Sequence, residues 1–131
     1  MDRDEALGIL ASFGWSGEAL DLGIAAEFCC EYCHRDLLAT IYDYDSWQTD
    51  HIVPVARGGS DDPRNHALAC KTCNFLKRHS VPSAAVDPLT DRKAAIVAIR
   101  EMLVARRNAK QAHLDKVREL FRPVGWRPMR V

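Results

Sequence analysis

Apolar positions along the chain predict helices at both ends. Between Asp4 and Glu27 they recur irregularly and four glycines interrupt them, which predicts one or two short helices. The longest periodic segment, TDRKAAIVAIREMLVARRNAKQAHLDKVRELF, follows Pro88 and is ended by Pro123. From Arg106 to His113 its otherwise apolar side is polar. We therefore expect this helix to leave the core there or to break into two.

The middle of the chain has the composition of short strands joined by a turn. QTDHIVPV is typical of a strand, and Pro54 restricts its end to a sheet edge. RGGSDDPRN combines residues that favour a turn by different mechanisms, and HALAC predicts a second short strand. KTCNFLKRH can begin a helix that stops by Pro82, whereas LLATIYDYDSW is compatible with a strand or a loop.

Four of the five cysteines form two pairs with the spacing of metal ligands. Cys30 with Cys33 and Cys70 with Cys73 would place four thiolates on one Zn²⁺ in tetrahedral geometry, leaving no position for water. We therefore predict a closed, structural zinc site. The 36 residues between the pairs exceed the roughly 15–20 of a simple zinc ribbon, so a folded unit must fill the interval.

Other uses of the cysteines fit the spacing less well. Small buried hydrophobes explain a lone cysteine but not a doubled Cys-x-x-Cys, and a redox motif needs one pair rather than two. Cys29 is left over and is expected to pack in the core. The chain begins without signal-peptide features and has no apolar run of about 20 residues. We therefore expect an intracellular protein without disulfides and without a membrane span.

The interval between the pairs contains residues suited to metal-assisted hydrolysis. Asp50 and Asn74 offer oxygen ligands of the kind that Mg²⁺ prefers, and His51 could accept a proton from water because its unperturbed pKa lies near neutrality. Adjacent strand residues point to opposite faces, so Asp50 and His51 act together only through a local distortion or an ion between strand and helix. An oxygen-ligated divalent ion with a histidine base is typical of sites that hydrolyse phosphodiester bonds.

Taken in order, these motifs resemble one family. Cys-x-x-Cys, Asp-His-Ile-x-Pro, Gly-Gly, an isolated Asn and Cys-x-x-Cys-Asn-x-x-Lys closely resemble the HNH endonucleases of the zinc-containing subclass, whose core is a ββα-metal (His-Me finger) unit. The resemblance spans about Cys30 to Lys77, and the three namesake positions fall on His51, Asn65 and Asn74.

The resemblance implies a role for each of these residues. His51 would be the general base that activates water, and Asp50 and Asn74 would hold a single catalytic divalent ion. Asn65 would brace the loop so that His51 keeps its ring orientation. The products would carry 5′-phosphate and 3′-hydroxyl ends. Many members have His where this chain has Asn74, and Asn shifts the expected ion towards Mg²⁺ or Mn²⁺.

Each residue also has an ordinary explanation. His51 is compatible with a half-buried strand histidine, Asp50 with a turn cap and Asn74 with a helix N-cap. Lys77 and Arg78 lie on the Asn74 side of the predicted helix and could meet a phosphate, although a solvated face explains them nearly as well.

Charge is unevenly distributed although the net charge is zero. Residues 1–31 carry one basic and seven acidic side chains, whereas residues 87–131 carry eleven basic and five acidic ones. The basic end makes a polyanion a reasonable partner, and its contacts would add affinity without reading sequence. The DNA-contact candidates are Lys77, Arg78, Arg106, Arg107 and Lys110.

We therefore expect a small α+β protein that cuts DNA. Residues 1–28 would form an acidic helical segment, 29–82 the ββα-metal nuclease core with structural Zn²⁺, and 83–131 a basic helix and tail. One rival is a non-catalytic zinc module that binds nucleic acid. Another is a protein-interaction domain that uses the long helix. Specificity, pathway, strand number and oligomeric state, including a homodimer through the C-terminal helix, stay open.

Overall fold

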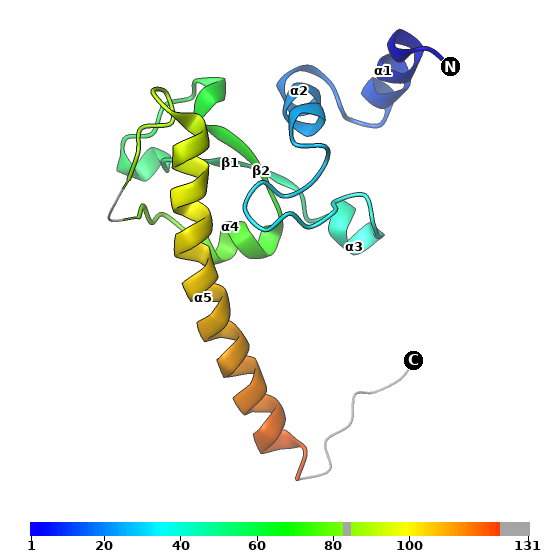
Figure 1. The fold of residues 1–131 in the computed structure, drawn as a ribbon. Coiled ribbons are helices and arrows are strands. Elements are labelled where there is room, and N and C mark those ends of the chain that lie inside the picture. The colour runs from blue at the N-terminus through cyan, green and yellow to red at the C-terminus, as the bar shows by residue number, and fades with distance from the viewer. Residues whose placement is uncertain (83–84, 124–131) are drawn as a thin grey trace.

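The computed structural model of the protein describes residues 1–82 and 85–123 (Figure 1). Its elements in chain order are α1 (Arg3–Ser12), α2 (Gly17–Ala25), α3 (Ile41–Tyr44), β1 (Gln48–His51), β2 (His66–Ala69), α4 (Lys71–Lys77) and α5 (Arg92–Phe121). Helices surround a small antiparallel sheet and a four-cysteine cluster. The predicted α+β fold class is confirmed, and its order β1–β2–α4 is that of a ββα unit.

The β1–β2 pair fixes the faces on which the central residues lie. Both strands have four residues and run antiparallel, with Asp50 opposite Ala67 and His51 opposite His66. Successive strand residues alternate between the two faces, so Asp50 and His51 point to opposite sides. The connection contains two short 3₁₀ turns, Val55–Arg57 and Pro63–Asn65. All four residues of β2 are buried, so this strand lies in the centre of the fold.

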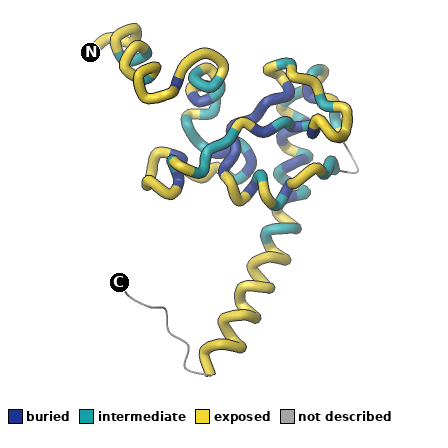
Figure 2. Tube along the Cα trace, turned by 180° about the vertical axis from the view of Figure 1, so that it is seen from behind, coloured by how far each residue is buried: buried dark blue, intermediate teal, exposed yellow. Residues whose placement is uncertain are grey.

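Helix α5 begins in the core and ends outside it. The Asp91 side chain caps its first turn by accepting a hydrogen bond from the Ala94 backbone N–H (3.0 Å). Its buried residues are Ala95, Ile96, Ile99 and Leu103, at the spacing of one helix face. Beyond this part the helix continues unbroken into solvent (Figures 1 and 2). The predicted exit from the core is confirmed, and the helix does not break.

The N-terminal segment is attached by aromatic packing. Trp15 is 3% exposed, stacks on Trp47 and donates a hydrogen bond from its indole N–H to Tyr44 (2.8 Å). The structure confirms two short helices here, α1 and α2. The expectation of a strand or loop in LLATIYDYDSW missed α3, which Thr40 caps by accepting a hydrogen bond from the Asp43 backbone N–H (3.1 Å).

The core lies where β1, β2, α4 and the first half of α5 meet (Figure 2). Leu37, Ile52, Leu68, Ile99 and Leu103 are each at most 2% exposed. The division into three segments stays a prediction, and the basic tail from residue 124 onward lies outside the described residues. Within the described part, no helix combines the length and apolar character needed to cross a bilayer.

Candidate active site and metal centre

The two cysteine pairs converge on one point. Cys30, Cys33, Cys70 and Cys73 place their sulfur atoms within 4.8 Å of one another, and the Cys33 and Cys70 sulfurs are 3.8 Å apart. A tetrahedron with metal–sulfur bonds of about 2.3 Å has edges of about 3.8 Å, so this cluster fits a zinc ion. Cys29 lies outside it and is only partly buried, so the expectation that it packs in the core was wrong.

The electrostatics of the cluster favour a thiolate at Cys70 and oppose one at Cys73. A hydrogen bond from Cys30 is the main cause that lowers the pKa of the Cys70 thiol to about 6. The pKa of Cys73 is raised, mainly through its hydrogen bond with Cys30, because four close sulfurs resist carrying four negative charges. Arg107, from α5, donates a hydrogen bond to the Cys73 sulfur (2.8 Å). This guanidinium stabilises negative charge on the cluster and connects α5 to it.

His51 ends β1 on the face away from α4. Its Nε2 is 2.8 Å from an oxygen of Asp61, in the loop after β1. Its ring meets that of His66, directly opposite on β2, edge to face at 4.7 Å between centroids. The side chain is 31% exposed and the Asp61 side chain 90% exposed. His51 is therefore reachable from solvent.

Asp50 lies on the opposite face of β1, in the interior, at 7% exposure. Its Oδ2 accepts a hydrogen bond from the Tyr32 hydroxyl (2.6 Å) and pairs with the Lys77 ammonium (3.1 Å). Burial, followed by the adjacent Asp50 charge, raises the pKa of Tyr32 well above its usual value, so Tyr32 remains a donor. The second oxygen, Oδ1, has no hydrogen-bond partner among the described residues.

Asn74 faces the same side of β1 from the middle of α4. Its Nδ2 donates a hydrogen bond to Gln48, which lies two residues before Asp50 and therefore on the same strand face. This arrangement leaves the amide oxygen of Asn74 free among the described residues. Asp50 and Asn74 thus both lie at the β1–α4 interface, each with one oxygen outside these bonds. Two such oxygens are the donor set that a Mg²⁺-class ion prefers.

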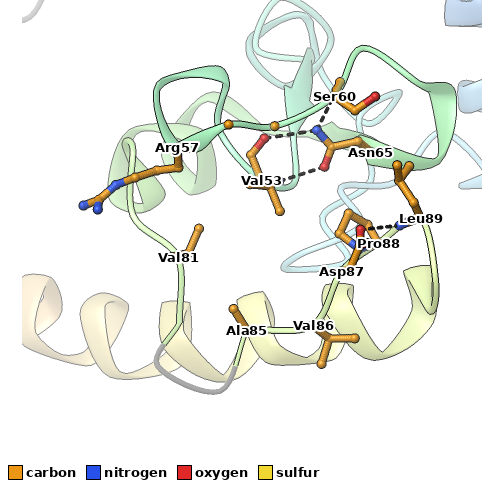
Figure 3. A pocket seen from close by; sticks show the side chains of 12 residues that line it. Val53, Arg57, Ser60, Asn65, Val81, Ala85, Val86, Asp87, Pro88 and Leu89 are labelled. Atoms are coloured by element: carbon orange, nitrogen blue, oxygen red, sulfur yellow. Dashed lines mark hydrogen bonds between the residues drawn. The ribbon is translucent and has the colours of Figure 1, made fainter.

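Asn65 holds the loop that follows His51. Its buried side chain (1% exposed) accepts from the Val53 N–H (2.9 Å) and donates to the carbonyl oxygens of Val53 (3.0 Å) and Ser60 (2.7 Å) (Figure 3). Within the same loop, a Cβ on Gly59 would lie 1.8 Å from the Val53 carbonyl oxygen. The loop closes only because position 59 has no side chain and position 65 supplies both donor and acceptor.

The basic residues predicted to contact DNA occupy different environments. Lys77 is 0% exposed, and its ammonium also donates to the His51 carbonyl oxygen (2.8 Å). The expectation that it meets phosphate was therefore wrong, because the buried Asp50 carboxylate draws the ammonium inside. Arg106 donates to the Leu76 and Lys77 carbonyl oxygens at the end of α4 (2.7 and 3.1 Å).

The remaining predicted contacts lie nearer to solvent. Arg78 is exposed, with its guanidinium 5.0 Å from the Phe75 ring centroid. Lys110 is also exposed, and Arg107 is partly buried against Cys73. Arg78 and Lys110, with Arg106, line one open groove between α4 and α5. Phe75 and Leu76 of α4, the helix that carries Asn74, also line this groove.

Sequence reasoning assigned nothing to His66, took Asp61 only as a turn residue and did not single out Glu18. The structure places His66 Nδ1 in contact with a Glu18 oxygen and groups His51, Asp61 and His66 with one ligand atom each within 4.8 Å of the others. The register explains the pairing of the histidines, because a hairpin closed by Asn65 brings positions 51 and 66 together. Glu18, 48 residues away along the chain, gave no local signal.

Comparison with known proteins identifies this region. Residues 30–80 match the sequence model of the HNH endonuclease family. No curated protein and no solved structure matches the chain significantly. The resemblance read from the motifs is confirmed over that segment, and it indicates a nuclease-type, nucleic-acid-related function.

Proposed function

We propose that the protein is a metal-dependent DNA endonuclease that uses His51 as its general base. The observation that carries this proposal is the geometry of β1 within the HNH-matching segment. One face of the strand presents a solvent-accessible histidine, while the other presents Asp50 to α4 and Asn74. A base and two oxygen ligands therefore flank the end of one strand, where a scissile phosphate could reach both.

Asp61 sets the protonation of the His51 ring. An ionised carboxylate only accepts hydrogen bonds, so the 2.8 Å contact places a proton on His51 Nε2. A neutral imidazole carries one ring proton, which leaves the Nδ1 lone pair to take a proton from water. Negative charge on Asp61 also stabilises the imidazolium that results, as the acid does in catalytic triads.

Asp50 and Asn74 would hold the catalytic ion through the oxygens that their other contacts leave free. When bound, an Mg²⁺-class ion there would polarise the scissile phosphate and stabilise the leaving oxygen. The two residues keep their positions without the ion, since Lys77 and Tyr32 fix Asp50 and Gln48 fixes Asn74. Such preorganisation limits the reorganisation needed at the moment of reaction.

The phosphodiester backbone would be bound by the exposed basic residues. Arg78 and Lys110 at the α4–α5 groove present positive charge to solvent, and such contacts act on any sequence. The groove is formed by α4, which also carries Asn74. Backbone binding in the groove would therefore position DNA relative to the ion and to His51.

Cleavage of supercoiled plasmid tests the proposal. We expect nicking by the wild type with Mg²⁺ or Mn²⁺ and none with EDTA, with bound zinc measured in every sample so that loss of structural metal is recognised. His51→Ala should lower the rate by at least about a hundredfold, the usual contribution of a general base. His79→Ala, at an exposed histidine just beyond α4, is the matched control and should cut normally.

The chemistry of the ends provides a second readout. Nicks with 5′-phosphate and 3′-hydroxyl ends are resealed by a DNA ligase without further treatment. If zinc-loaded wild type cuts nothing but binds DNA with a strong salt dependence, the protein is instead a nucleic-acid-binding module. An equal rate for His51→Ala would remove His51 from the mechanism.

A further inference from the structure

The face of the sheet opposite α4 contains a second group of metal-ligating side chains. His51, Asp61 and His66 come from β1, the following loop and β2, and one ligand atom of each lies within 4.8 Å of the other two. None of them takes part in the four-cysteine cluster. The interface between β1 and α4, where Asp50 and Asn74 lie, is on the other side of the strand.

His66 carries the strongest indication of a ligand. The side chain is 8% exposed, and its Nε2 is buried with no hydrogen-bond partner among the described residues. A buried nitrogen without a partner is costly and rare. Its other nitrogen, Nδ1, contacts the Glu18 carboxylate. Since a carboxylate only accepts, the proton lies on Nδ1 and the buried Nε2 holds a free lone pair.

This arrangement is the one that metal-bound histidines have in proteins. A ligating histidine usually donates its second ring N–H to a carboxylate, which fixes the tautomer and increases the basicity of the ligating nitrogen. Glu18 gives His66 that partner from α2, an element outside the segment matched to the HNH family. Two imidazoles and a carboxylate suit zinc-class divalent ions and leave a fourth position open.

We propose that His51, Asp61 and His66 form a second divalent transition-metal site, and that an ion bound there inhibits the nuclease. The ion would take the place of the proton that His51 Nε2 now donates to Asp61. That single ring proton moves to Nδ1 by exchange with solvent, so the imidazole stays neutral while its Nε2 lone pair binds the ion. No lone pair is left on His51 to accept a proton from water. The inhibitory part rests on the proposed general base; the site itself does not.

Metal titration of the zinc-loaded protein tests the site. With the cysteine cluster filled, we expect the wild type to bind one further Zn²⁺, measured against a competing indicator, and His79→Gln to do the same. Asp61→Asn should weaken this second ion at least tenfold. The Asp61 side chain is 90% exposed, so its substitution leaves the fold intact. His66→Gln should weaken it similarly, with retained cysteine-bound zinc showing that the variant is folded.

The outcomes separate the two proposals. Absence of a second ion on the wild type, or a second-site affinity in Asp61→Asn and His66→Gln equal to that of the wild type, overturns the site. If the ion binds as expected, added Zn²⁺ should inhibit Mg²⁺-dependent cleavage by wild type at the concentrations that fill the site. For Asp61→Asn, the rate at each Zn²⁺ concentration is compared with the rate of the same variant without added Zn²⁺. Half-inhibition of this variant should require at least tenfold more Zn²⁺ than half-inhibition of the wild type. If the protein binds the second ion but never cuts DNA, the proposed metal site stands and the proposed nuclease activity is wrong.

Discussion

The Lys77 ammonium lies 3.1 Å from Asp50 Oδ2 in an ion pair that is almost completely shielded from water. The same nitrogen donates to the main-chain carbonyl of His51 (2.8 Å). One side chain from the last turn of α4 therefore holds both residues of the Asp-His pair, the first through its carboxylate and the second through its backbone. The four-cysteine cluster holds the start of α4 through Cys70 and Cys73, and Lys77 fixes its end to β1.

Replacing Lys77 should destabilise the protein strongly. Lys77→Met leaves the buried Asp50 carboxylate with Tyr32 as its donor and without a counter-charge, a change that typically costs about 3–5 kcal/mol. Urea unfolding of zinc-loaded protein measures the difference. Arg78→Met, at the neighbouring exposed position, is the control and should change stability by less than about 0.5 kcal/mol. A Lys77 variant as stable as this control would contradict the buried pair.

The double variant Lys77→Met with Asp50→Leu separates pairing from burial. Replacing a buried ion pair by apolar side chains is often neutral or stabilising. The double variant should therefore regain much of the stability that the single variant loses. It should not cleave DNA, because the proposed ion ligand Asp50 is missing. Failure to regain stability would mean that the bond from Lys77 to the His51 carbonyl matters more than the charge pair.

Gly59→Ala should open the loop next to His51. Its Cβ would stand 1.8 Å from the Val53 carbonyl oxygen, the atom to which Asn65 donates, so backbone must move. We expect a loss of about 1–3 kcal/mol and reduced cleavage. Gly8→Ala, in α1 with nothing within 4 Å of the added Cβ, is the matched control. It should raise stability by up to about 1 kcal/mol. Thermal unfolding of the two variants decides the comparison.

Asn65→Asp tests the hydrogen bonds by which Asn65 holds the loop after His51. The substitution keeps an acceptor for the Val53 N–H but removes both N–H bonds to the Val53 and Ser60 carbonyl oxygens, and it places a charge at a position 1% exposed. We expect at least about 2 kcal/mol of destabilisation. In cleavage assays kcat should fall more than KM rises, because Asn65 does not line the basic groove and would act through the position of His51. A pure KM effect would indicate contact with DNA instead.

The elements that could be predicted from sequence are those with local signals. Paired Cys-x-x-Cys spacing defined the metal cluster, and the turn residues between Pro54 and His66 defined the hairpin. The burial of Lys77 was not predictable, because helical spacing gave its side of α4 but not the position of Asp50 opposite. Glu18 was missed for the same reason, since only the packing of α2 against β2 brings it to His66.

Arg107 connects the long helix to the metal cluster, and its removal should weaken zinc binding. Arg107→Leu preserves helix propensity but removes the donor that lies 2.8 Å from the Cys73 sulfur. Outer hydrogen bonds to metal ligands commonly contribute about 10–100-fold in affinity, so zinc should be lost to a chelator at correspondingly lower chelator concentration. Lys110→Leu, exposed one turn further along α5, should leave zinc affinity unchanged while weakening DNA binding in a salt-dependent manner. If both variants retain zinc equally, the cluster is held by its four thiolates alone, and α5 contributes only through the packing of Ile99 and Leu103.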